Sequence, residues 1–506
     1  MNEQITHKKI ETSLSFYGGM VGVLLPFILF IAGVIIIALS GAPDEKGFWP
    51  VLIASLSLSL LLCKNKKDFG EVVIHGMAQP IVMIMISAWI LASIIGILMS
   101  ITGLVEALTW IADLFYLNHI SIVVGTFFIC CIISLSTGSS FATILICSPI
   151  LYPAGGLLGA HLPTLAGAII GGATFGDFIA PISDTTIASA LSQKAPVGQT
   201  VKSRIPYISV AFILALIAYL VSAAWHGPDT IDNTYRLAGD PRGLPMLLVP
   251  AYIIYRFLKG THLLNGLLSG LIFGTALGLI TGLLPLEQII SLDLENMVAV
   301  SFIIKGINRA VGLSFFTILL MGLVATIRAS GIMDRLVDFA SGKIQTLKST
   351  ETWIAAMAAA AVLLTTHRIV AILSIAEFSN KTGQQIPPMR RANILSLVVC
   401  VFPFLLPYFI PVILMANTTS AGLEYALPPV SPLEVGMHNF IAWALALVAV
   451  MVIFFGWQGD SEPHRRNQIT LQLSTMSLFS CPVWIYKKYS NNRLKFIKLL
   501  FRIQFI

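Results

Sequence analysis

The feature that most constrains this chain is a succession of long apolar runs that contain hardly any charged residues. Of its 506 residues, 56% are hydrophobic and only 11% are charged, whereas a soluble protein carries about 25% charged residues. About 20 consecutive apolar residues are enough to cross the hydrocarbon of a bilayer. The sequence therefore predicts an all-α polytopic membrane protein, and it excludes a soluble enzyme, a disulfide scaffold and a disordered regulator.

The apolar runs define the expected membrane spans. The first, 17–40, is longer than the core of about 7–15 residues in a cleaved signal peptide, so we expect a spanning helix there. The other expected spans are 48–63, 80–103, 119–136, 139–159, 163–190, 205–225, 244–258, 263–283, 311–327, 352–378, 392–417 and 437–457. Because some of these runs are broken, the prediction is about 11–13 membrane segments.

The loop charges predict the orientation, because lysine and arginine gather in cytoplasmic loops. The basic loops contain Lys64, Lys66 and Lys67, and then Lys194, Lys202 and Arg204. We expect these loops and the N-terminal residues 1–16 on the cytoplasmic side of a cell (inner) membrane. The acidic loop with Asp229, Asp232 and Asp240 is expected outside.

The chain divides into two apolar halves, 17–225 and 244–457, followed by the tail 458–506. In the first half, the polar group 136–140 interrupts a helix, and a proline-broken polar segment follows at 174–186. In the second half, 365–367 interrupts a helix, and the proline-broken segment 402–407 follows. Paired interruptions point to a transporter's binding site. They predict two inverted repeats with discontinuous or re-entrant helices.

The densest polar cluster within an apolar tract is 172–186, and it contains two aspartates. Asp177 and Asp184 are seven residues apart, and Pro181 between them is expected to break the helix. Freed carbonyls, carboxylates and hydroxyls are hard oxygen ligands that suit Na⁺. A charge at the bilayer centre costs roughly 2.5–3.5 kcal/mol, so two retained aspartates indicate a function. The alternative is an extramembrane loop with Asp184 as a helix N-cap, and the apolar flanks argue against it.

The motif Gly176-Asp177-x-x-x-Pro181-x-Ser183-Asp184-Thr185-Thr186 resembles the signature of the NhaC-type Na⁺/H⁺ antiporters. This family of the ion transporter superfamily also includes sodium-linked organic-acid exchangers. The resemblance is specific over about 120–210 and extends in hydropathy over about 15–457. It implies an inverted-repeat secondary transporter whose ion-handling residues are Asp177, Ser183, Asp184, Thr185 and Thr186.

The chain departs from this family pattern in three places. Ala180 stands where serine is usual, and Ile187 stands where asparagine is frequent. The segment 392–423 contains no charged residue, whereas the family usually carries an acidic and polar stretch ahead of a proline-rich segment that ends in Trp-Asn-Thr. The chain thus resembles a divergent member of the family. Whether its second half still binds Na⁺ is a question that the sequence leaves open.

The candidate binding residues come from both interruptions. Asp177 and Asp184 are expected to hold H⁺ and Na⁺ in turn, which makes them the hypothetical metal ligands. Histidine as a residue type titrates near neutral pH, which makes His367 a candidate, and Arg368 could bind a carboxylate; the alternative is an interfacial pair. The other candidates, which offer neutral oxygens, are Ser183, Thr185, Thr186, Ser136, Thr137, Ser139, Ser140 and Thr174.

The predicted function is that of a secondary active transporter, most simply a Na⁺/H⁺ antiporter without a cofactor. The alternative is a Na⁺- or H⁺-coupled exchanger of a small organic acid or amino acid, with Arg368 binding the carboxylate. A passive channel is a further alternative. The sequence has no P-loop, HExxH or GxSxG motif, which argues against an ATPase or a membrane hydrolase.

The expected partners are membrane lipid and a transported cation or small organic solute, without nucleic acid, and a homodimer is possible. Of the net charge of +7, the tail supplies +6, from eight basic and two acidic residues. Such a tail could lie on an anionic inner leaflet. The alternative is a disordered or non-native tail.

Overall fold

The computed structural model describes residues 13–40, 45–226, 239–293, 298–344 and 346–457. The predicted tail 458–506 and most of the predicted N-terminal segment lie outside the described residues. Nine helices among the described residues are long and apolar enough to cross a membrane, counting Leu162–Ser192 as one. The chain is therefore a multi-pass membrane protein, as its composition predicts. Strands β1 (Ser291–Asp293) and β2 (Val298–Val300) add one short antiparallel hairpin to the helices.

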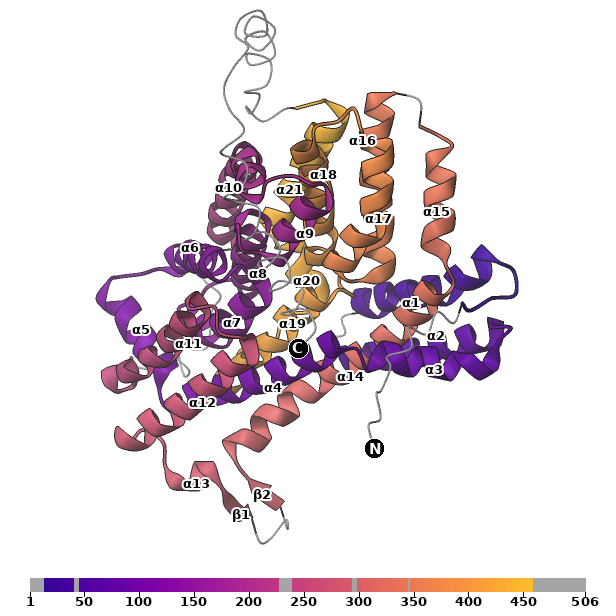
Figure 1. Cartoon of the computed structure of the whole chain (residues 1–506). Helices are drawn as coiled ribbons and strands as arrows, with labels where there is room; N and C mark the ends of the chain where they lie inside the picture. The colour runs from indigo at the N-terminus through magenta and orange to yellow at the C-terminus, as the bar shows by residue number, and fades with distance from the viewer. Residues whose placement is uncertain (1–12, 41–44, 227–238, 294–297, 345, 458–506) are drawn as a thin grey trace, which may run out of the picture. The chain divides into compact units, whose positions relative to one another are not determined.

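One group of helices packs around the long helix α14 (Phe302–Ala329). Its neighbours are α2 (Trp49–Leu62), α3 (Lys66–Met77) and α4 (Pro80–Ile101), and α1 (Met20–Leu39) lies against α2 (Figure 1). The sequence predicts a span over 311–327 only, but α14 begins nine residues earlier, at Phe302. The polar residues Lys305 and Arg309 thus lie within the helix and hide its start from a hydropathy count.

A second group is built on α6 (His119–Thr137), α7 (Ser140–Leu157), α8 (Leu162–Ile179), α9 (Asp184–Ser192) and α10 (Val197–His226). Helices α6 and α8 pack closely because Gly172 and Gly176 face α6. A Cβ atom on Gly176 would lie 2.2 Å from the Ser134 hydroxyl. The Ser134 hydroxyl donates to the Ala173 carbonyl at 2.8 Å. Small residues at such a spacing are typical of close helix contacts in membranes.

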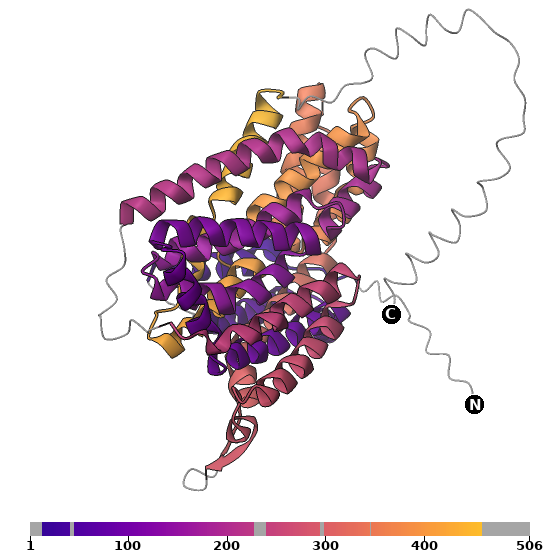
Figure 2. The same cartoon turned by 90° about the vertical axis from the view of Figure 1, so that its left-hand side faces the viewer.

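The third group comes from the second half of the chain. It comprises α16 (Leu347–Thr365), α17 (Arg368–Thr382), α18 (Pro388–Val401), α19 (Ile410–Thr419), α20 (Pro432–Met437) and α21 (Phe440–Phe454). Helix α9 packs against α17 and α18, and α10 packs along α21 (Figure 1). In Figure 2 the long magenta helix α10 lies beside these orange and yellow helices. The two halves therefore meet where the first half is interrupted.

The remaining described elements are shorter or peripheral: η1 (Glu45–Phe48), α5 (Leu104–Leu114), η3 (Pro241–Leu247), α11 (Leu248–Leu258), α12 (Leu263–Ile280), α13 (Leu286–Ile289), α15 (Ile332–Ser341), η4 (Phe402–Phe404) and η5 (Ser420–Tyr425). Helices α3 and α15 were not expected as spans, and each carries several charged residues.

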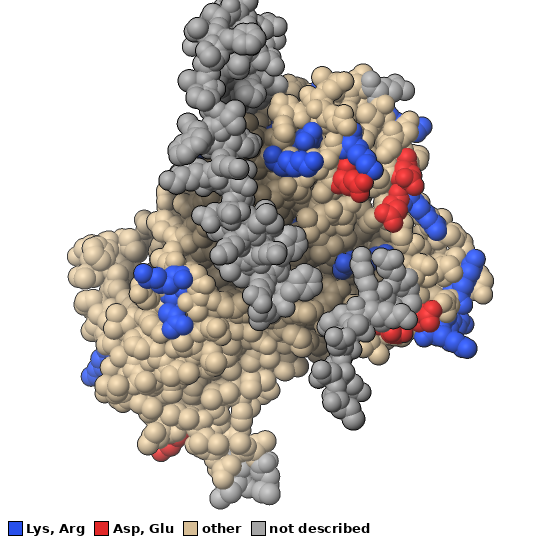
Figure 3. Space-filling model, viewed as in Figure 1, with Lys and Arg blue, Asp and Glu red and all other residues tan. Residues whose placement is uncertain are grey.

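Large apolar side chains lie on the surface of several spans. Ile36, Ile132 and Ile272 are 64%, 63% and 65% exposed. On the face in Figure 3, acidic and basic side chains form a few separate groups, and most of the remaining described surface is neither acidic nor basic. Extended apolar surface is unfavourable in water and marks contact with a membrane or a partner, so these side chains fit a lipid-facing surface.

Both predicted helix interruptions are present, and their backbones are alike. Between α6 and α7, Gly138 has φ 65° and ψ 16°, and Ser139 has φ −134° and ψ 116°. Between α16 and α17, Thr366 has φ 52° and ψ 6°, and His367 has φ −128° and ψ 117°. Each break thus consists of one left-handed residue followed by one extended N-cap. The relation of the two halves as inverted repeats stays a prediction.

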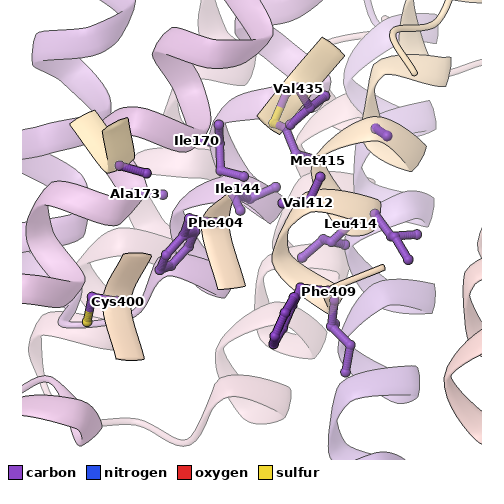
Figure 4. Close-up of a cluster of buried hydrophobic side chains, with 14 of the residues drawn as sticks. Ile144, Ile170, Ala173, Cys400, Phe404, Phe409, Val412, Leu414, Met415 and Val435 are labelled. Atoms are coloured by element: carbon purple, nitrogen blue, oxygen red, sulfur yellow. The ribbon is translucent and has the colours of Figure 1, made fainter. Parts of the chain in front are cut away.

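The second-half interruption around η4 is packed with apolar side chains. Figure 4 shows Phe404, Phe409, Val412 and Met415 with Ile144 from α7 and Ile170 from α8, and all of them are buried. These side chains carry no oxygen ligand. This agrees with the charge-free segment 392–423, and it means that the break around η4 contributes packing rather than polar side-chain ligands.

Candidate functional site

The site is built on the break between α8 and α9. Helix α8 ends at Ile179, where the Ala180 N–H still donates to the Gly176 carbonyl at 2.7 Å. Pro181 has no N–H and cannot continue the pattern. Ser183 then takes an extended conformation as the N-cap of α9, so that Asp184 is the first residue of that helix. The N-cap is therefore Ser183, not Asp184.

Side chains satisfy the carbonyls that this break leaves free at the end of α8. The Asp177 carbonyl accepts hydrogen bonds from the Ser183 hydroxyl at 2.9 Å and the Thr185 hydroxyl at 3.0 Å. The Phe178 carbonyl accepts one from Arg204 Nη1 at 3.0 Å. Helix ends that are buried need such partners, and here they come from the start of α9 and from α10.

The carboxylate of Asp177 is only 2% exposed, and donors from three helices contact it. Its Oδ1 accepts a hydrogen bond from the Ser183 hydroxyl at 2.7 Å. Its Oδ2 accepts one from the Ser140 hydroxyl at 2.6 Å and forms an ion pair with Arg368 Nη1. Arg368 Nη2 also donates to the Ser140 oxygen at 3.3 Å. The ion pair joins residues that are 191 positions apart, one from each half of the chain.

The donors around Asp177 lie at helix N-termini. Ser140 is the first residue of α7, Arg368 is the first residue of α17, and Ser183 caps α9. A helix N-terminus carries a partial positive charge and favours an anion. Asp177 itself lies near the C-terminus of α8, where a carboxylate is disfavoured. The three N-termini and the guanidinium offset that penalty, so this place is suited to a negative charge.

A cavity of about 610 Å³ adjoins the carboxylate. Most of its polar lining comes from three helix breaks: Thr137, Ser139 and Ser140 between α6 and α7, Asp177, Asp184 and Thr185 around the end of α8, and Thr366, His367 and Arg368 between α16 and α17. Thr261 and His262, between α11 and α12, complete it. The rest is largely apolar and includes Trp89 of α4 and Phe257 of α11. A mostly apolar cavity of a few hundred Å³ with a few convergent polar groups is typical of small-molecule sites. It is far larger than one dehydrated cation needs.

The structure brings most of the predicted site residues to this cavity. Asp177, Ser140, Ser183, Thr185 and Arg368 form the bonded cluster described above. Asp184 is exposed on the first turn of α9, and Thr137 and Ser139 line the cavity from the other break. His367 lines it too, and its Nδ1 accepts a hydrogen bond from the Val370 N–H at 3.5 Å as the N-cap of α17.

Three predicted residues are placed elsewhere. The Ser136 hydroxyl donates to the Ile132 carbonyl of its own helix at 2.7 Å. The Thr174 hydroxyl donates to the Ile170 carbonyl at 2.7 Å and accepts a hydrogen bond from Asn439. The Thr186 hydroxyl accepts one from Arg204 Nη1 at 3.0 Å. None of the three is among the described residues that line the cavity.

The position of Arg204 differs from the one that the sequence predicts. It was expected in a cytoplasmic loop, but it lies within α10 and is 0% exposed. Besides the Phe178 carbonyl and Thr186, its guanidinium donates to Ser189 Oγ at 2.8 Å and Asn393 Oδ1 at 2.9 Å. Asn393 belongs to α18, so Arg204 also connects the break to the second half. Lys202, Arg204 and Pro206 together resemble a loop in the sequence, and only the structure shows that α10 runs unbroken from Val197 past Pro206.

No group of three or more His, Cys, Asp or Glu residues in the described part of the chain is arranged to hold a metal ion. A cation at this place would have to bind the Asp177 carboxylate together with hydroxyls and free carbonyls. That oxygen set fits a weakly held, transported alkali cation better than a tightly bound transition metal.

Comparisons with known proteins agree with the signature motif. Residues 14–224 match the model of the Na⁺/H⁺ antiporter family. This confirms the predicted resemblance for that segment, and the matching family is one of transporters, not of enzymes.

Two curated relatives match over shorter stretches. The chain is 28% identical over 193 residues to the malate-2H⁺/Na⁺-lactate antiporter of Bacillus subtilis (strain 168), which covers 38% of this chain and 40% of that protein. It is 44% identical over 63 residues to the Na⁺/H⁺ antiporter NhaC of Alkalihalophilus pseudofirmus, which covers 12% of this chain and 14% of that protein. The matches thus span less than half the length of either relative.

Among solved structures, that of MtrF of Neisseria gonorrhoeae, described as illuminating a class of antimetabolite efflux pumps, aligns with 87% of this chain and 97% of its own. The sequence identity is 14% and the TM-score is 0.35. A TM-score this low does not establish a shared fold.

Proposed function

We propose that this membrane protein, residues 14–224 of which match the Na⁺/H⁺ antiporter family, is a secondary antiporter that exchanges Na⁺ for H⁺ on Asp177. The observation that supports this most is the carboxylate of Asp177, buried at a helix break and surrounded by Ser140, Ser183 and Arg368. An intramembrane carboxylate with a defined partner is by default a functional group.

In this proposal, Asp177 binds H⁺ or Na⁺ only when Arg368 has moved away from it. The guanidinium neutralises the carboxylate in the structure described here, so a proton or a cation has to compete with it. The hydroxyls of Ser140, Ser183 and Thr185 supply neutral oxygens to the bound Na⁺. Asp184, exposed at the cavity wall, attracts the cation as it enters. Alternating access then carries either ion across, but not both together.

Asp177→Asn tests this function in sealed vesicles that contain the purified protein. The amide keeps the size of the side chain but cannot exchange a proton for Na⁺, so Na⁺-driven proton movement should fall to the level of vesicles without protein. Asp113→Asn is the control, because Asp113 is exposed on α5. If Asp177→Asn retains the proton movement of wild type, Asp177 is not the carrier.

A second function, coupled exchange of a small organic carboxylate, is supported by the size of the cavity and by Arg368. About 610 Å³ would accommodate a small organic acid, and a guanidinium next to helix N-termini suits a carboxylate. The similarity to a malate-2H⁺/Na⁺-lactate antiporter points the same way. In this proposal, the solute carboxylate replaces Asp177 as the partner of Arg368.

Uptake of labelled lactate and malate under imposed Na⁺ and pH gradients tests this second function. Arg368→Ala should abolish the counterflow of whichever acid wild type transports, and Arg335→Ala, a change of an exposed arginine on α15, should leave it unchanged. Flux that continues after the counter-ion is removed would indicate a passive channel instead. Absence of lactate and malate uptake by wild type would count against this second function and leave the first to stand.

For the molecule as a whole, we propose two inverted repeats, 17–225 and 244–457, in the cell (inner) membrane with the N-terminus in the cytoplasm. The similar backbones of the two helix breaks support the repeats. Lipid surrounds the apolar faces, and the oligomeric form, a homodimer among the possibilities, can be measured by mass photometry in detergent.

A further inference from the structure

Thr366 has an unfavourable backbone conformation for its residue type. Its φ is 52°, in the left-handed region. The other described non-glycine residues with positive φ are Tyr116, Lys194 and Ala426, and none of them is β-branched. A β-branched residue is a true outlier there, because the left-handed conformation brings the Cβ of an L-residue too close to the following carbonyl oxygen.

The corresponding position of the first half avoids this strain. Gly138, between α6 and α7, has φ 65° and almost the same ψ as Thr366. Glycine adopts this conformation freely, so a glycine would serve the break between α16 and α17 equally well. The turn itself therefore does not require a threonine side chain. Strained backbone clusters at functional sites, which points to a functional role for this side chain.

The hydroxyl of Thr366 provides an independent observation. The residue is 5% exposed, and its Oγ1 has no hydrogen-bond partner among the described residues. A buried hydroxyl without a partner is disfavoured, because it has lost its hydrogen bonds to water without replacement. Thr366 also lines the 610 Å³ cavity, together with Arg368 two positions later. Strain and a missing partner thus coincide at one residue of the cavity wall.

We propose that Thr366 is a specificity-determining residue whose hydroxyl donates a hydrogen bond to the carboxylate of the transported organic acid while Arg368 pairs with its charge. This inference rests on the second function proposed above. The bound solute supplies the partner that the hydroxyl lacks. Thr366 and Arg368 line the same cavity from the same helix break, so a carboxylate bound there lies next to both residues.

The test separates strain from binding by three substitutions at Thr366, assayed by uptake of labelled lactate in vesicles. Thr366→Val keeps the branched side chain but loses the hydroxyl, so the KM for lactate should rise about 10- to 100-fold, as expected for a lost hydrogen bond to a charged group. Thr366→Gly loses both the branched side chain and the hydroxyl. Its KM for lactate should rise as much as that of the valine variant, while its Tm stays at or above that of wild type because the backbone strain is relieved. Thr366→Ser keeps the hydroxyl, and its KM should lie well below that of the valine variant.

Ala426→Gly is the matched control. Ala426 has φ 56° but does not belong to the described cavity lining, so relief of its strain should leave the KM for lactate unchanged. The proposal is overturned if Thr366→Val has the KM of wild type, or if the Gly variant loses affinity and Tm together, as a purely structural role requires. If wild type transports lactate and Thr366→Val matches it, only this inference fails. If wild type transports malate instead of lactate, the same variants are compared by their KM for malate, and if it takes up neither acid, the carboxylate function fails with this inference.

Discussion

Asp177 shows how a single carboxylate can be held at membrane depth. Its charge is balanced by Arg368, and its two oxygens accept hydroxyl hydrogen bonds from Ser140 and Ser183. All three of these partners lie at helix N-termini. In the proposed exchange, a proton or a cation has to compete with these partners for the carboxylate. Arg368 is the partner whose removal changes the charge of the site most.

Arg368→Gln should therefore change ion affinity in a defined direction. Without the competing guanidinium, Na⁺ should bind Asp177 more tightly, and the half-saturating Na⁺ concentration should fall about tenfold, equivalent to ~1.4 kcal/mol. Na⁺-dependent proton movement in vesicles measures it, with Arg335→Gln as the control. An unchanged or higher half-saturating concentration would show that Arg368 and Na⁺ do not compete.

At the scale of elements, the break between α8 and α9 depends on two close contacts. Gly172 and Gly176 let α6 approach α8, and Arg204 of α10 bonds to the Phe178 carbonyl, Thr186 and Ser189 across the break. Both contacts hold the peptide that carries Asp177. Substitutions here should lower the stability of the protein, and any loss of transport should follow from that loss of stability.

Gly176→Ala should lower stability by about 1–3 kcal/mol, the usual range for an overpacked contact, because its Cβ would lie 2.2 Å from the Ser134 hydroxyl. The thermal unfolding midpoint in detergent measures this. Gly125→Ala on α6 is the matched control, since nothing lies within 4 Å of its Cβ position, and it should be neutral or stabilising. Equal midpoints for the two variants would contradict the packing account.

Arg204→Met should destabilise the protein more strongly, by about 3–5 kcal/mol, since it leaves several buried acceptors without a donor. Lys202→Met on the same helix is the control, because Lys202 is exposed. Both midpoints can be measured in the same detergent. A loss of less than about 1 kcal/mol for Arg204→Met would mean that the break holds without this guanidinium.

At the scale of the whole molecule, the proposed orientation can be tested by labelling. Single cysteines at Lys194 and Asp240 should react with a membrane-impermeant maleimide from opposite sides, Lys194→Cys from the cytoplasm and Asp240→Cys from outside. The described native cysteines are all buried, and Cys481, which lies outside the described residues, is replaced by serine in both variants to remove background labelling. Labelling of both positions from one side would refute the predicted topology of the first half.

The sequence by itself determined the membrane class, most of the spans and the places where helices break. These signals are local, because lipid requires each span to be apolar and to satisfy its own backbone hydrogen bonds. Proline residues and polar groups within a span mark the positions where its helix is interrupted. The motif around Asp177 and the family match over 14–224 follow from the same local residues.

Only the tertiary structure decided which side chains meet. The pair of Asp177 and Arg368, 191 residues apart, the burial of Arg204 and the missing partner of Thr366 depend on how the helices pack against one another. Apolar runs are nearly interchangeable in lipid, so they specify that a helix spans the membrane but not its neighbours. The few polar side chains between the helices, and the glycines that let them approach, determine those neighbours.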